Sequence, residues 1–271
     1  MTDSAISPLI DELWDQRGDL TLDDADARRE VVAAVDLLDT GVARVALVVG
    51  DDVVVDERAK RAILLSFKVL PMVQGSDPFT HDRIPLKTTF DGVRVVAGAL
   101  ARWGSYFEPG VVLMPSYTNI GGYVGAGSMV DTWATVGSCA QVGRNVHLSG
   151  GVGIGGVLEP PQAAPVVIED DAFIGSRSMV VEGARVRAGA KLGAGVILTS
   201  STRVFEAETG KELDRGVAPA RAVCVGSTRV KSFEGGDFGL PCVLVLRYLE
   251  EGQVHDKLAL NEILREHGVA P

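Results

Sequence analysis

Aliphatic side chains recur at every sixth position through the middle of the chain, in two uninterrupted blocks. A period of six fits neither an α-helix nor a long strand, whose side chains repeat about every 3.6 and 2 residues. It predicts a parallel β-helix of hexapeptide repeats, in which each repeat supplies one short strand and one corner. The two blocks are Val124, Val130, Val136, Val142, Leu148 and Ile154, then Ile168, Ile174, Val180, Val186, Leu192, Leu198 and Val204.

Two segments depart from this period. Between Trp103 and Tyr123 the spacing is blurred, with Thr118 on a position that elsewhere is aliphatic, and this predicts an irregular first coil. Residues 156–167 separate the two blocks and contain Pro160 and Pro161. Because extra residues cannot lie inside the prism of a β-helix, they are expected to form a projecting loop.

The flanking segments have other patterns. Helical spacing of apolar residues predicts amphipathic helices over 4–17, 24–38 and 57–69. Hairpins are predicted over 42–55 and 205–214, strands over 93–97 and 243–248, and a last helix over 258–266. The expected fold is therefore mainly β, with a small N-terminal α/β cap domain (1–100), the β-helix (101–225) and a C-terminal extension (226–271).

Composition narrows the class of protein. The net charge of −10 argues against a nucleic-acid partner. Cys139, Cys224 and Cys242 form no CxxC pair, which argues against a disulfide framework or a zinc site and favours a reducing compartment. The polar first residues are unlike a secretory signal, and no stretch reads as a membrane span. We therefore expect a cytoplasmic protein without a membrane partner, a metal or a permanently bound cofactor.

The predicted prism also limits where chemistry can occur. A regular prism has an apolar interior and flat faces, so ligand pockets are expected where two copies meet or where a loop crosses a neighbour. Metal-dependent hydratases on this scaffold need three histidines on adjacent coils, whereas His147 is the only histidine in the repeat. The run from Gly151 to Gly156 matches GxGxxG, but it lies inside the six-residue register and no helix can follow it. We interpret it as corners rather than as a dinucleotide site.

Two long motifs carry a resemblance to a known family. They are Leu113-Met-Pro-Ser-Tyr-Thr-Asn-Ile-Gly and Met129-Val-Asp-Thr-Trp-Ala-Thr-Val-Gly-Ser-Cys-Ala-Gln, which continues to His147-Leu-Ser-Gly-Gly-Val-Gly-Ile-Gly-Gly. With shorter matches at Phe173-Ile-Gly-Ser-Arg and Asn261-Glu-Ile-Leu-Arg, nearly the whole chain resembles the tetrahydrodipicolinate N-succinyltransferases of the bacterial lysine (diaminopimelate) pathway. The resemblance implies a left-handed β-helix homotrimer with active sites between subunits. It also implies transfer of succinyl from succinyl-CoA to the amino group of L-2-amino-6-oxopimelate, an amino dicarboxylate that is the ring-opened form of tetrahydrodipicolinate.

The same resemblance assigns roles to single residues. Arg94 and Asp131 match substrate-binding positions of the family, and Asp131 also matches the carboxylate that helps the amine to react. A guanidinium can hold a carboxylate of the acceptor bidentately, and a carboxylate can bind and deprotonate its ammonium. Arg177 is a third substrate candidate, whose alternative role is a salt bridge with Glu169 or Asp170. Backbone N–H groups at the glycine corners of residues 150–156 could stabilise the oxyanion.

Binding of the acyl-CoA, whether succinyl-CoA or acetyl-CoA, needs a smooth groove and a few cations for the phosphates. Gly193, Ala194 and Gly195 offer a wall of small residues in the late coils. Lys257 matches a lysine of the family's C-terminal segment. Lys231 and Arg229 are further local cations.

One position departs from the family pattern Gly-Ala-Arg-Ser-Glu, because this chain has Gly175-Ser-Arg-Ser-Met179. Methionine can neither bind an ammonium nor carry a proton. Either Asp131 suffices, or Glu182 or Glu169 takes the role, or the acceptor has changed. A change of acceptor or donor would fit related N-acyltransferases of secondary metabolism, of the tabtoxin type, which use acetyl-CoA or another amino acid. His147 is the alternative base, and a non-enzymatic trimeric scaffold is the alternative to catalysis.

Overall fold

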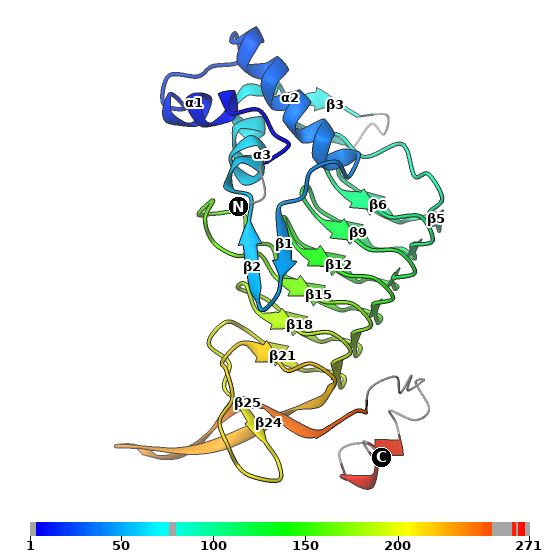
Figure 1. The fold of residues 1–271 in the computed structure, drawn as a ribbon, viewed down its shortest axis with the longest axis vertical. Coiled ribbons are helices and arrows are strands. Elements are labelled where there is room, and N and C mark those ends of the chain that lie inside the picture. Colours follow the sequence, from blue (N-terminus) through cyan, green and yellow to red (C-terminus); the bar gives the residue numbers. More distant parts are fainter. Residues whose placement is uncertain (1–3, 76–79, 251–261, 264, 269–271) are drawn as a thin grey trace.

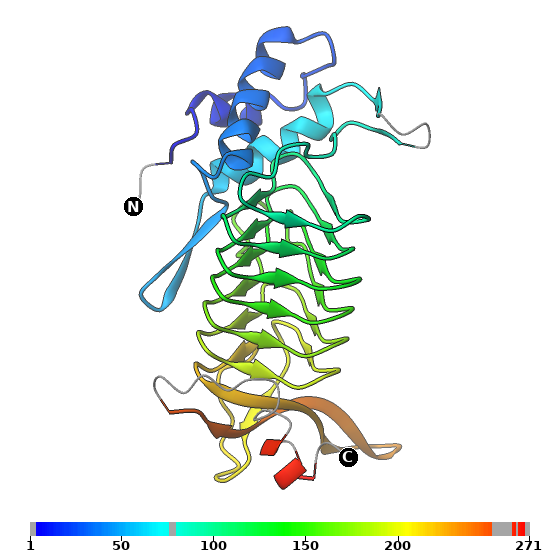
Figure 2. The same cartoon turned by 90° about the vertical axis from the view of Figure 1, so that its right-hand side faces the viewer.

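The computed structural model describes residues 4–75, 80–250, 262–263 and 265–268. A left-handed parallel β-helix forms a triangular prism along most of the chain (Figures 1 and 2). Helices of the N-terminal segment cover one end of the prism, and a long two-stranded ribbon crosses the other end. The predicted fold class is confirmed. Within the described part of the chain, no helix has the length and apolarity needed to cross a membrane.

Three sheets form the faces of the prism, and each coil adds one short strand to each sheet. The nine-stranded sheet has the order β22 (Val204–Glu206), β25 (Gly236–Tyr248), β24 (Ala222–Phe233), β20 (Lys191–Leu192), β17 (Phe173–Ile174), β14 (His147–Leu148), β11 (Met129–Val130), β8 (Val112–Leu113) and β5 (Arg94–Val95). The β6 sheet comprises β6 (Leu100–Ala101), β9 (Tyr117–Thr118), β12 (Thr135–Val136), β15 (Gly153–Ile154), β18 (Met179–Val180) and β21 (Ile197–Leu198). The β7 sheet comprises β7 (Tyr106–Phe107), β10 (Tyr123–Val124), β13 (Gln141–Val142), β16 (Val167–Ile168), β19 (Arg185–Val186) and β23 (Val217–Ala218).

Corners between the sheets stack into three edges, which we name by one residue each. The Asp131 edge joins the nine-stranded sheet to the β6 sheet and contains residues 131–134, 149–152, 175–178 and 193–196. The Glu182 edge joins the β6 sheet to the β7 sheet and contains residues 137–140 and 181–184. The Glu169 edge joins the β7 sheet to the nine-stranded sheet and contains residues 143–146, 169–172 and 187–190.

The aliphatic residues of the repeat point into the prism and form one continuous core. Val124 pairs with Val142 and Val130 with Leu148, so that one coil takes 18 residues. Each inward residue therefore lies against its equivalents one coil above and below. This stacking buries the repeat residues almost completely, which explains why their spacing is so strict.

The irregularity predicted between Trp103 and Tyr123 is a single shortened turn, and it does not lie in the first coil, because β5 and β6 precede it. Strands β7, β8 and β9 pair in parallel with the next coil. Leu113 pairs with Val130, 17 residues away, whereas Thr118 pairs with Val136 at the usual 18. The turn containing Pro115 is therefore one residue short, and this shift hid the period in the sequence.

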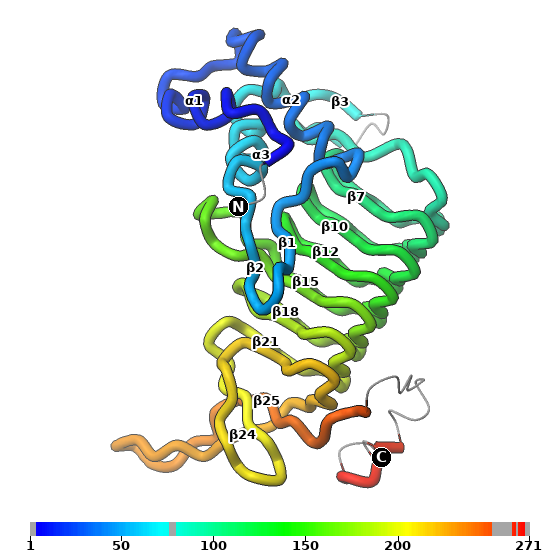
Figure 3. The backbone as a smooth tube through the Cα atoms, in the orientation of Figure 1, coloured from blue at the N-terminus to red at the C-terminus, as the bar shows by residue number. Residues whose placement is uncertain are grey.

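Residues between β15 and β16 project from the Glu182 edge, as predicted. Val142 pairs with Ile168, 26 residues away rather than 18, so the loop inserts eight residues into one coil. The loop lies beside the N-terminal helices (Figure 3), where Leu158 packs against their core. The fully buried Lys60 donates hydrogen bonds from Nζ to the carbonyl oxygens of Pro160 (3.1 Å) and Ala163 (2.8 Å).

The N-terminal segment contains α1 (Leu9–Asp15), α2 (Ala25–Asp39) and α3 (Glu57–Val69). The bounds of α3 agree with the prediction, and the carboxylate of Asp56 accepts a hydrogen bond from the Ala59 N–H at its start. The helices share one apolar core with Ile120 and Cys139 of the prism, which joins the two parts. Short strands β3 (Val73–Gln74) and β4 (His81–Asp82) follow α3.

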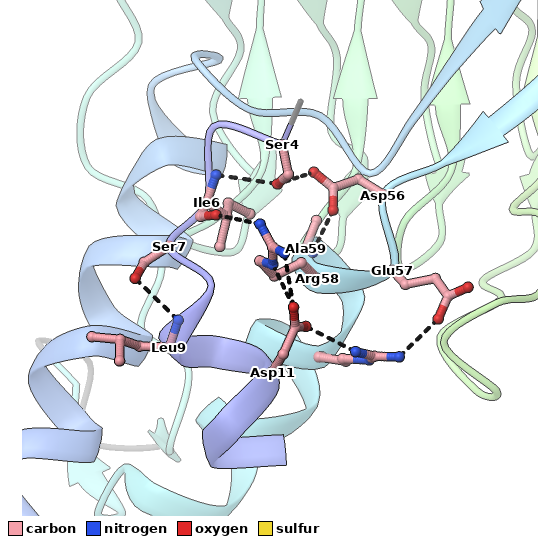
Figure 4. A network of polar contacts seen from close by, with 10 residues as sticks. Ser4, Ile6, Ser7, Leu9, Asp11, Asp56, Glu57, Arg58 and Ala59 are labelled. Carbon is pink, nitrogen blue, oxygen red and sulfur yellow. Dashed lines mark hydrogen bonds and ion pairs between the residues drawn. The ribbon is translucent and has the colours of Figure 1, made fainter. Parts of the chain in front are cut away.

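A polar network ties the start of the chain to α3 (Figure 4). The Asp11 carboxylate accepts hydrogen bonds from Arg58 (2.9 Å) and Arg61 (2.8 Å), while Ser4 donates to Asp56 (2.6 Å). Burial by itself would raise the pKa of Asp11, but the two guanidinium groups outweigh it and lower that pKa. The network thereby anchors α1 on α3.

The predicted hairpin over 42–55 consists of β1 (Ala46–Val49) and β2 (Asp52–Val55), paired antiparallel. It extends from the helices along the β7 sheet. Arg187 forms an ion pair with Asp51 at its tip (2.9 Å), and Arg185 donates to the carbonyl oxygen of the same residue. These bonds fasten the hairpin to the prism.

The end of the chain differs in part from expectation. Residues 205–214 fold back through an antiparallel bridge between Phe205 and Glu212, as predicted. The predicted strand over 243–248 is too short, because β25 spans Gly236–Tyr248 and pairs antiparallel with β24. Outside the prism a ribbon needs no inward aliphatic repeat, so its sequence carried no periodic signal. The predicted helix over 258–266 falls mostly outside the described residues.

Candidate functional site

The Asp131 edge brings together Asp131, Arg177 and the segment Gly193–Gly195. Four successive corners stack there through backbone hydrogen bonds: the N–H of Gly151 donates to Thr132, that of Arg177 to Gly150, and that of Gly195 to Ser176. The third residue of each corner has a positive φ, which lets the turn close within four residues. In order along the prism, these residues are Trp133 (61°), Gly151 (70°), Arg177 (61°) and Gly195 (72°).

Asp131 begins its corner directly after β11, and its side chain remains partly exposed. Its Oδ1 accepts a hydrogen bond from the N–H of Thr132 (2.7 Å), while Oδ2 lies 3.9 Å from Nε2 of His147 on the neighbouring strand β14. The His147 ring stacks on Phe173, with 5.3 Å between ring centroids and 7° between planes. The two bases considered from the sequence are therefore neighbours, and a proton released near one is within reach of the other.

Arg177 belongs to the corner two coils from that of Asp131, and its side chain lies across Gly151 in the corner between them. A Cβ built on Gly151 would come within 2.8 Å of Cδ and 2.9 Å of Nε of Arg177. The side chain thus occupies space that exists because residue 151 is a glycine. No ion pair between Arg177 and Glu169 or Asp170 exists among the described residues, and both carboxylates belong to a different edge.

Trp133 belongs to the same corner as Asp131 and was assigned no role from the sequence. Its side chain is 72 % exposed, and a bulky residue with φ of 61° is strained. A large exposed aromatic ring beside a carboxylate offers an apolar wall for a ligand. Its position two residues after Asp131, in the motif Asp131-Thr-Trp, was the one feature of the sequence that could have suggested a role at the site.

Arg94 lies on the same sheet as Asp131 but does not contact it. Arg94 pairs with Val112, and Val112 pairs with Met129, so two strand intervals separate β5 from β11. At about 4.8 Å per interval the separation along the prism is roughly 10 Å. A guanidinium at that distance could bind the far end of an extended dicarboxylate, and its substrate role stays a prediction.

Met179 follows Arg177 on β18, and its sulfur lies over Gly153, where a Cβ would clash. The two glutamates considered as substitutes for the family's glutamate lie elsewhere on this chain. Glu182 is a corner residue of the Glu182 edge, and Glu169 binds Arg185 and the N–H of Ala188 at the Glu169 edge. Within one chain, neither glutamate shares the edge of Asp131.

Most backbone N–H groups at the glycine corners, which were expected to stabilise the oxyanion, already donate hydrogen bonds within the prism. The N–H groups of Gly151, Gly153 and Gly155 donate to carbonyl oxygens of adjacent coils, so they cannot bind an oxyanion without breaking the ladder. Residues Gly193–Gly195 form the corner after Arg177, and a Cβ on Gly195 would meet only open space. This corner gives the smooth wall expected for CoA, although its role in binding is untested.

The cations that the sequence suggested for binding the CoA phosphates do not lie in the corner of Gly193–Gly195. Arg229 and Lys231 lie on the ribbon, where they stack over the rings of Phe205 (4.7 Å) and Phe233 (5.0 Å). Lys257 lies outside the described residues. Across the described part of the chain, no three His, Cys, Asp or Glu side chains are grouped so that they could hold a metal ion.

Comparison with known proteins gives two family matches. Residues 5–69 match the N-terminal model of tetrahydrodipicolinate N-succinyltransferase, and residues 165–200 match the hexapeptide repeat of succinyl-transferase. The chain is 45 % identical over 285 residues to the 2,3,4,5-tetrahydropyridine-2,6-dicarboxylate N-succinyltransferase of Paramagnetospirillum magneticum, covering 98 % of this chain and all of the relative. It is also 45 % identical to the enzyme of the same name from Acinetobacter baylyi, over 97 % of this chain and 99 % of the relative.

A solved structure supports the fold alone. A Campylobacter jejuni protein, described as a 2,3,4,5-tetrahydropyridine-2-carboxylate N-succinyltransferase, superposes with a TM-score of 0.52 at 18 % identity. The match covers 80 % of this chain and 62 % of that protein.

Proposed function

The chain belongs to the tetrahydrodipicolinate N-succinyltransferase family, and from this premise we propose that it transfers succinyl from succinyl-CoA to the amino group of L-2-amino-6-oxopimelate. The observation that carries the proposal is the joint placement of Asp131 and Arg177 at one edge of the prism. A carboxylate and a guanidinium there match the ammonium and a carboxylate of an amino dicarboxylate.

In the proposed reaction Asp131 binds the acceptor ammonium and takes one proton, with His147 as the nearest further base. The free amine attacks the thioester carbonyl, the C–S bond breaks, and the CoA sulfur leaves as the amide forms. Arg177 holds a carboxylate of the acceptor, so that the amine keeps its position beside Asp131. Trp133 excludes water from one side of the site.

The assay follows free thiol from CoA with succinyl-CoA and the acceptor present together or singly. Thiol release only with both substrates is expected; its absence would contradict the proposal. Asp131→Asn should lower kcat by about 10²–10⁴, the usual size of a general-base contribution. If His147→Ala abolished activity while Asp131→Asn did not, the assignment of the base to Asp131 would be wrong.

The acceptor can be tested separately at Met179. Under the proposed function, Met179→Glu should change turnover of the usual acceptor by less than about tenfold. A much larger gain would indicate that the natural acceptor differs. A donor screen with succinyl-CoA and acetyl-CoA, crossed with several amino dicarboxylates, identifies the substrate pair directly.

We also propose that the active protein is a homotrimer with sites between subunits. Trp133 is largely exposed at the Asp131 edge, so a second subunit could pack against it there. A second subunit would supply the other side of the site through the heterologous contacts by which a cyclic trimer closes. Analytical ultracentrifugation should give a mass three times the 28.6 kDa of one chain. A monomer that retains full activity would contradict this proposal.

A further inference from the structure

A cavity of about 260 Å³ lies between the hairpin strand β1 and the β7 sheet, at the Glu169 edge. Ala46, Leu47 and Val48 line it from the hairpin, and Val167 and Gly143 line it from the prism. Arg44 and Asp170 also border it. This edge of the prism is separate from the Asp131 edge, and the proposed reaction uses none of these residues.

Arg44 is a partly buried cation on the wall of this cavity. Its guanidinium carbon lies 3.5 Å from the centroid of the Tyr123 ring, and its Nε donates to Oε1 of Gln141 (3.2 Å). Among the described residues no carboxylate oxygen lies within 4.0 Å of it. Burial lowers the pKa of Arg44, as expected for a desolvated charge.

The nearby glutamates are already engaged by other arginines. Glu108 accepts two hydrogen bonds from Arg144, at 2.9 and 3.0 Å, and a third from the Tyr123 hydroxyl. Glu169 is held by Arg185. The partly buried Arg44 guanidinium is therefore held by a ring and an amide rather than by a carboxylate, which leaves its free end available to an anion in the cavity.

Asp170 contributes an exposed carboxylate to the border of the same cavity. Its Oδ1 accepts a hydrogen bond from the backbone N–H of Arg144 (2.7 Å). No side-chain nitrogen of a lysine or arginine lies within 4.0 Å of its carboxylate in the described part of the chain. The cavity is therefore bordered by a cation and by an exposed anion that attract each other across it without forming an ion pair.

We propose that this cavity binds a small zwitterionic amino acid, with its carboxylate on Arg44 and its ammonium toward Asp170. The volume is below the roughly 300–1,000 Å³ of sites for drug-sized ligands, so it suits a small metabolite. A phosphate would need further cations, whereas Arg44 is the one cation that borders the cavity among the described residues. Leu47 and Val48 favour an apolar or aliphatic side chain on the ligand.

The proposal is tested by calorimetric titration of the full chain with the standard L-amino acids. γ-Aminobutyrate is included because it shows whether a zwitterion with a longer separation between its charges also binds. Propionate and propylamine serve as half-ligands that carry one charge each. One or more amino acids should bind, and neither half-ligand should bind comparably. Asp170→Asn, which keeps the acceptor oxygen for the Arg144 N–H, should weaken binding at least about tenfold. Arg44→Gln should do the same.

Two matched variants complete the design. Asp171→Asn removes the adjacent carboxylate, which does not border the cavity, and Asp131→Asn removes the carboxylate of the proposed active site. Both should bind the amino acid as the unaltered chain does. The proposal is overturned if no amino acid binds, if propionate binds as tightly as the amino acid, if Asp170→Asn binds normally, or if binding disappears in Asp131→Asn.

Discussion

Gly151 determines where the side chain of Arg177 can lie. The guanidinium arm crosses this residue on its way along the Asp131 edge, and no larger residue would leave the space. The positive φ of 70° adds a second reason for glycine, because an L side chain is strained there. One small residue thus sets the geometry of a neighbouring coil.

Gly151→Ala should therefore impair substrate binding as well as stability. The Cβ forces Arg177 away from the edge, so KM for the acceptor should rise roughly tenfold or more, while left-handed strain costs about 1–2 kcal/mol. Gly210→Ala is the control, because it has a similar φ of 69° and meets no atom within 4 Å. It should lose stability without a change in KM, and an equal KM for both variants would refute the role of Gly151.

Thr118 places a hydroxyl inside the core. The residue is almost fully buried, and its Oγ1 has no hydrogen-bond partner among the described residues. Thr118→Val keeps the shape and should stabilise the fold by about 1–2 kcal/mol, measured by urea unfolding. Ser128→Ala gives the contrast, since Ser128 donates to Gly143 and accepts from Val146 (both 2.8 Å), and its loss should destabilise the fold. A destabilised Thr118→Val would mean that the hydroxyl has a partner.

At the scale of elements, the projecting loop is held in place by a helix far from it in the sequence. Lys60 on α3 is fully buried, and its ammonium donates to two carbonyl oxygens of the loop. A buried lysine without such bonds would be costly. The loop is therefore expected to keep its conformation only while α3 is folded against it.

Lys60→Met should free the loop. The substitution leaves two carbonyl groups unsatisfied, at a cost of about 1–3 kcal/mol, and it should raise hydrogen exchange across residues 158–164. Lys68→Met, on the exposed end of the same helix, is the matched control and should leave exchange in the loop unchanged. Unchanged exchange in Lys60→Met would show that Leu158 packing suffices.

At the scale of the whole molecule, one network links three coils and the N-terminal segment. Arg44 stacks on Tyr123, whose hydroxyl donates to Glu108 (2.6 Å), and Glu108 also binds Arg144. The hydrogen bond from Arg144, with those from Tyr123 and the Ala126 N–H, lowers the pKa of Glu108 to about 2 against the opposing effect of burial. Burial and the Glu108 carboxylate raise the pKa of Tyr123 to about 12.

This network predicts a specific loss of stability in acid. Because the pKa of Glu108 is lower in the folded chain, its contribution is present above the ordinary value of 4.5 and disappears as pH falls toward 2. Glu108→Gln should lower Tm by roughly 2–6 °C at pH 7, and the difference from wild type should vanish near pH 2. The exposed Glu208→Gln is the control and should show no such dependence. A constant difference between pH 7 and pH 2 would contradict the link to ionisation.

Much of the fold followed from local patterns, and the errors have physical reasons. The bounds of α3 and the hairpin over 42–55 were predicted because their signals lie within a few residues. The irregularity before Tyr123 was predicted, but its cause was not, because only the strand pairing shows that the turn at Pro115 is one residue short and that the inward residues change register. The long ribbon was missed because strands outside the prism need no inward repeat.

The candidate site was predictable only in part. Asp131 and Arg177 could be named from motifs, but their shared edge depends on the 18-residue coil and on the length of the inserted loop. No role was predicted for Trp133, because its exposure at a corner is visible only in the structure. The proposed oxyanion donors proved largely occupied, since a ladder of backbone hydrogen bonds uses them.

The six-residue period by itself determined the β-helix, because every inward position must be apolar once coils stack on one another. It also determined which residues face outward and can carry chemistry. Only the tertiary structure decided which of those outward residues meet. Arg177 reaches over Gly151 beside Asp131, and Arg44 faces Asp170 across a cavity, because coil lengths and hairpin docking set contacts that no local pattern encodes.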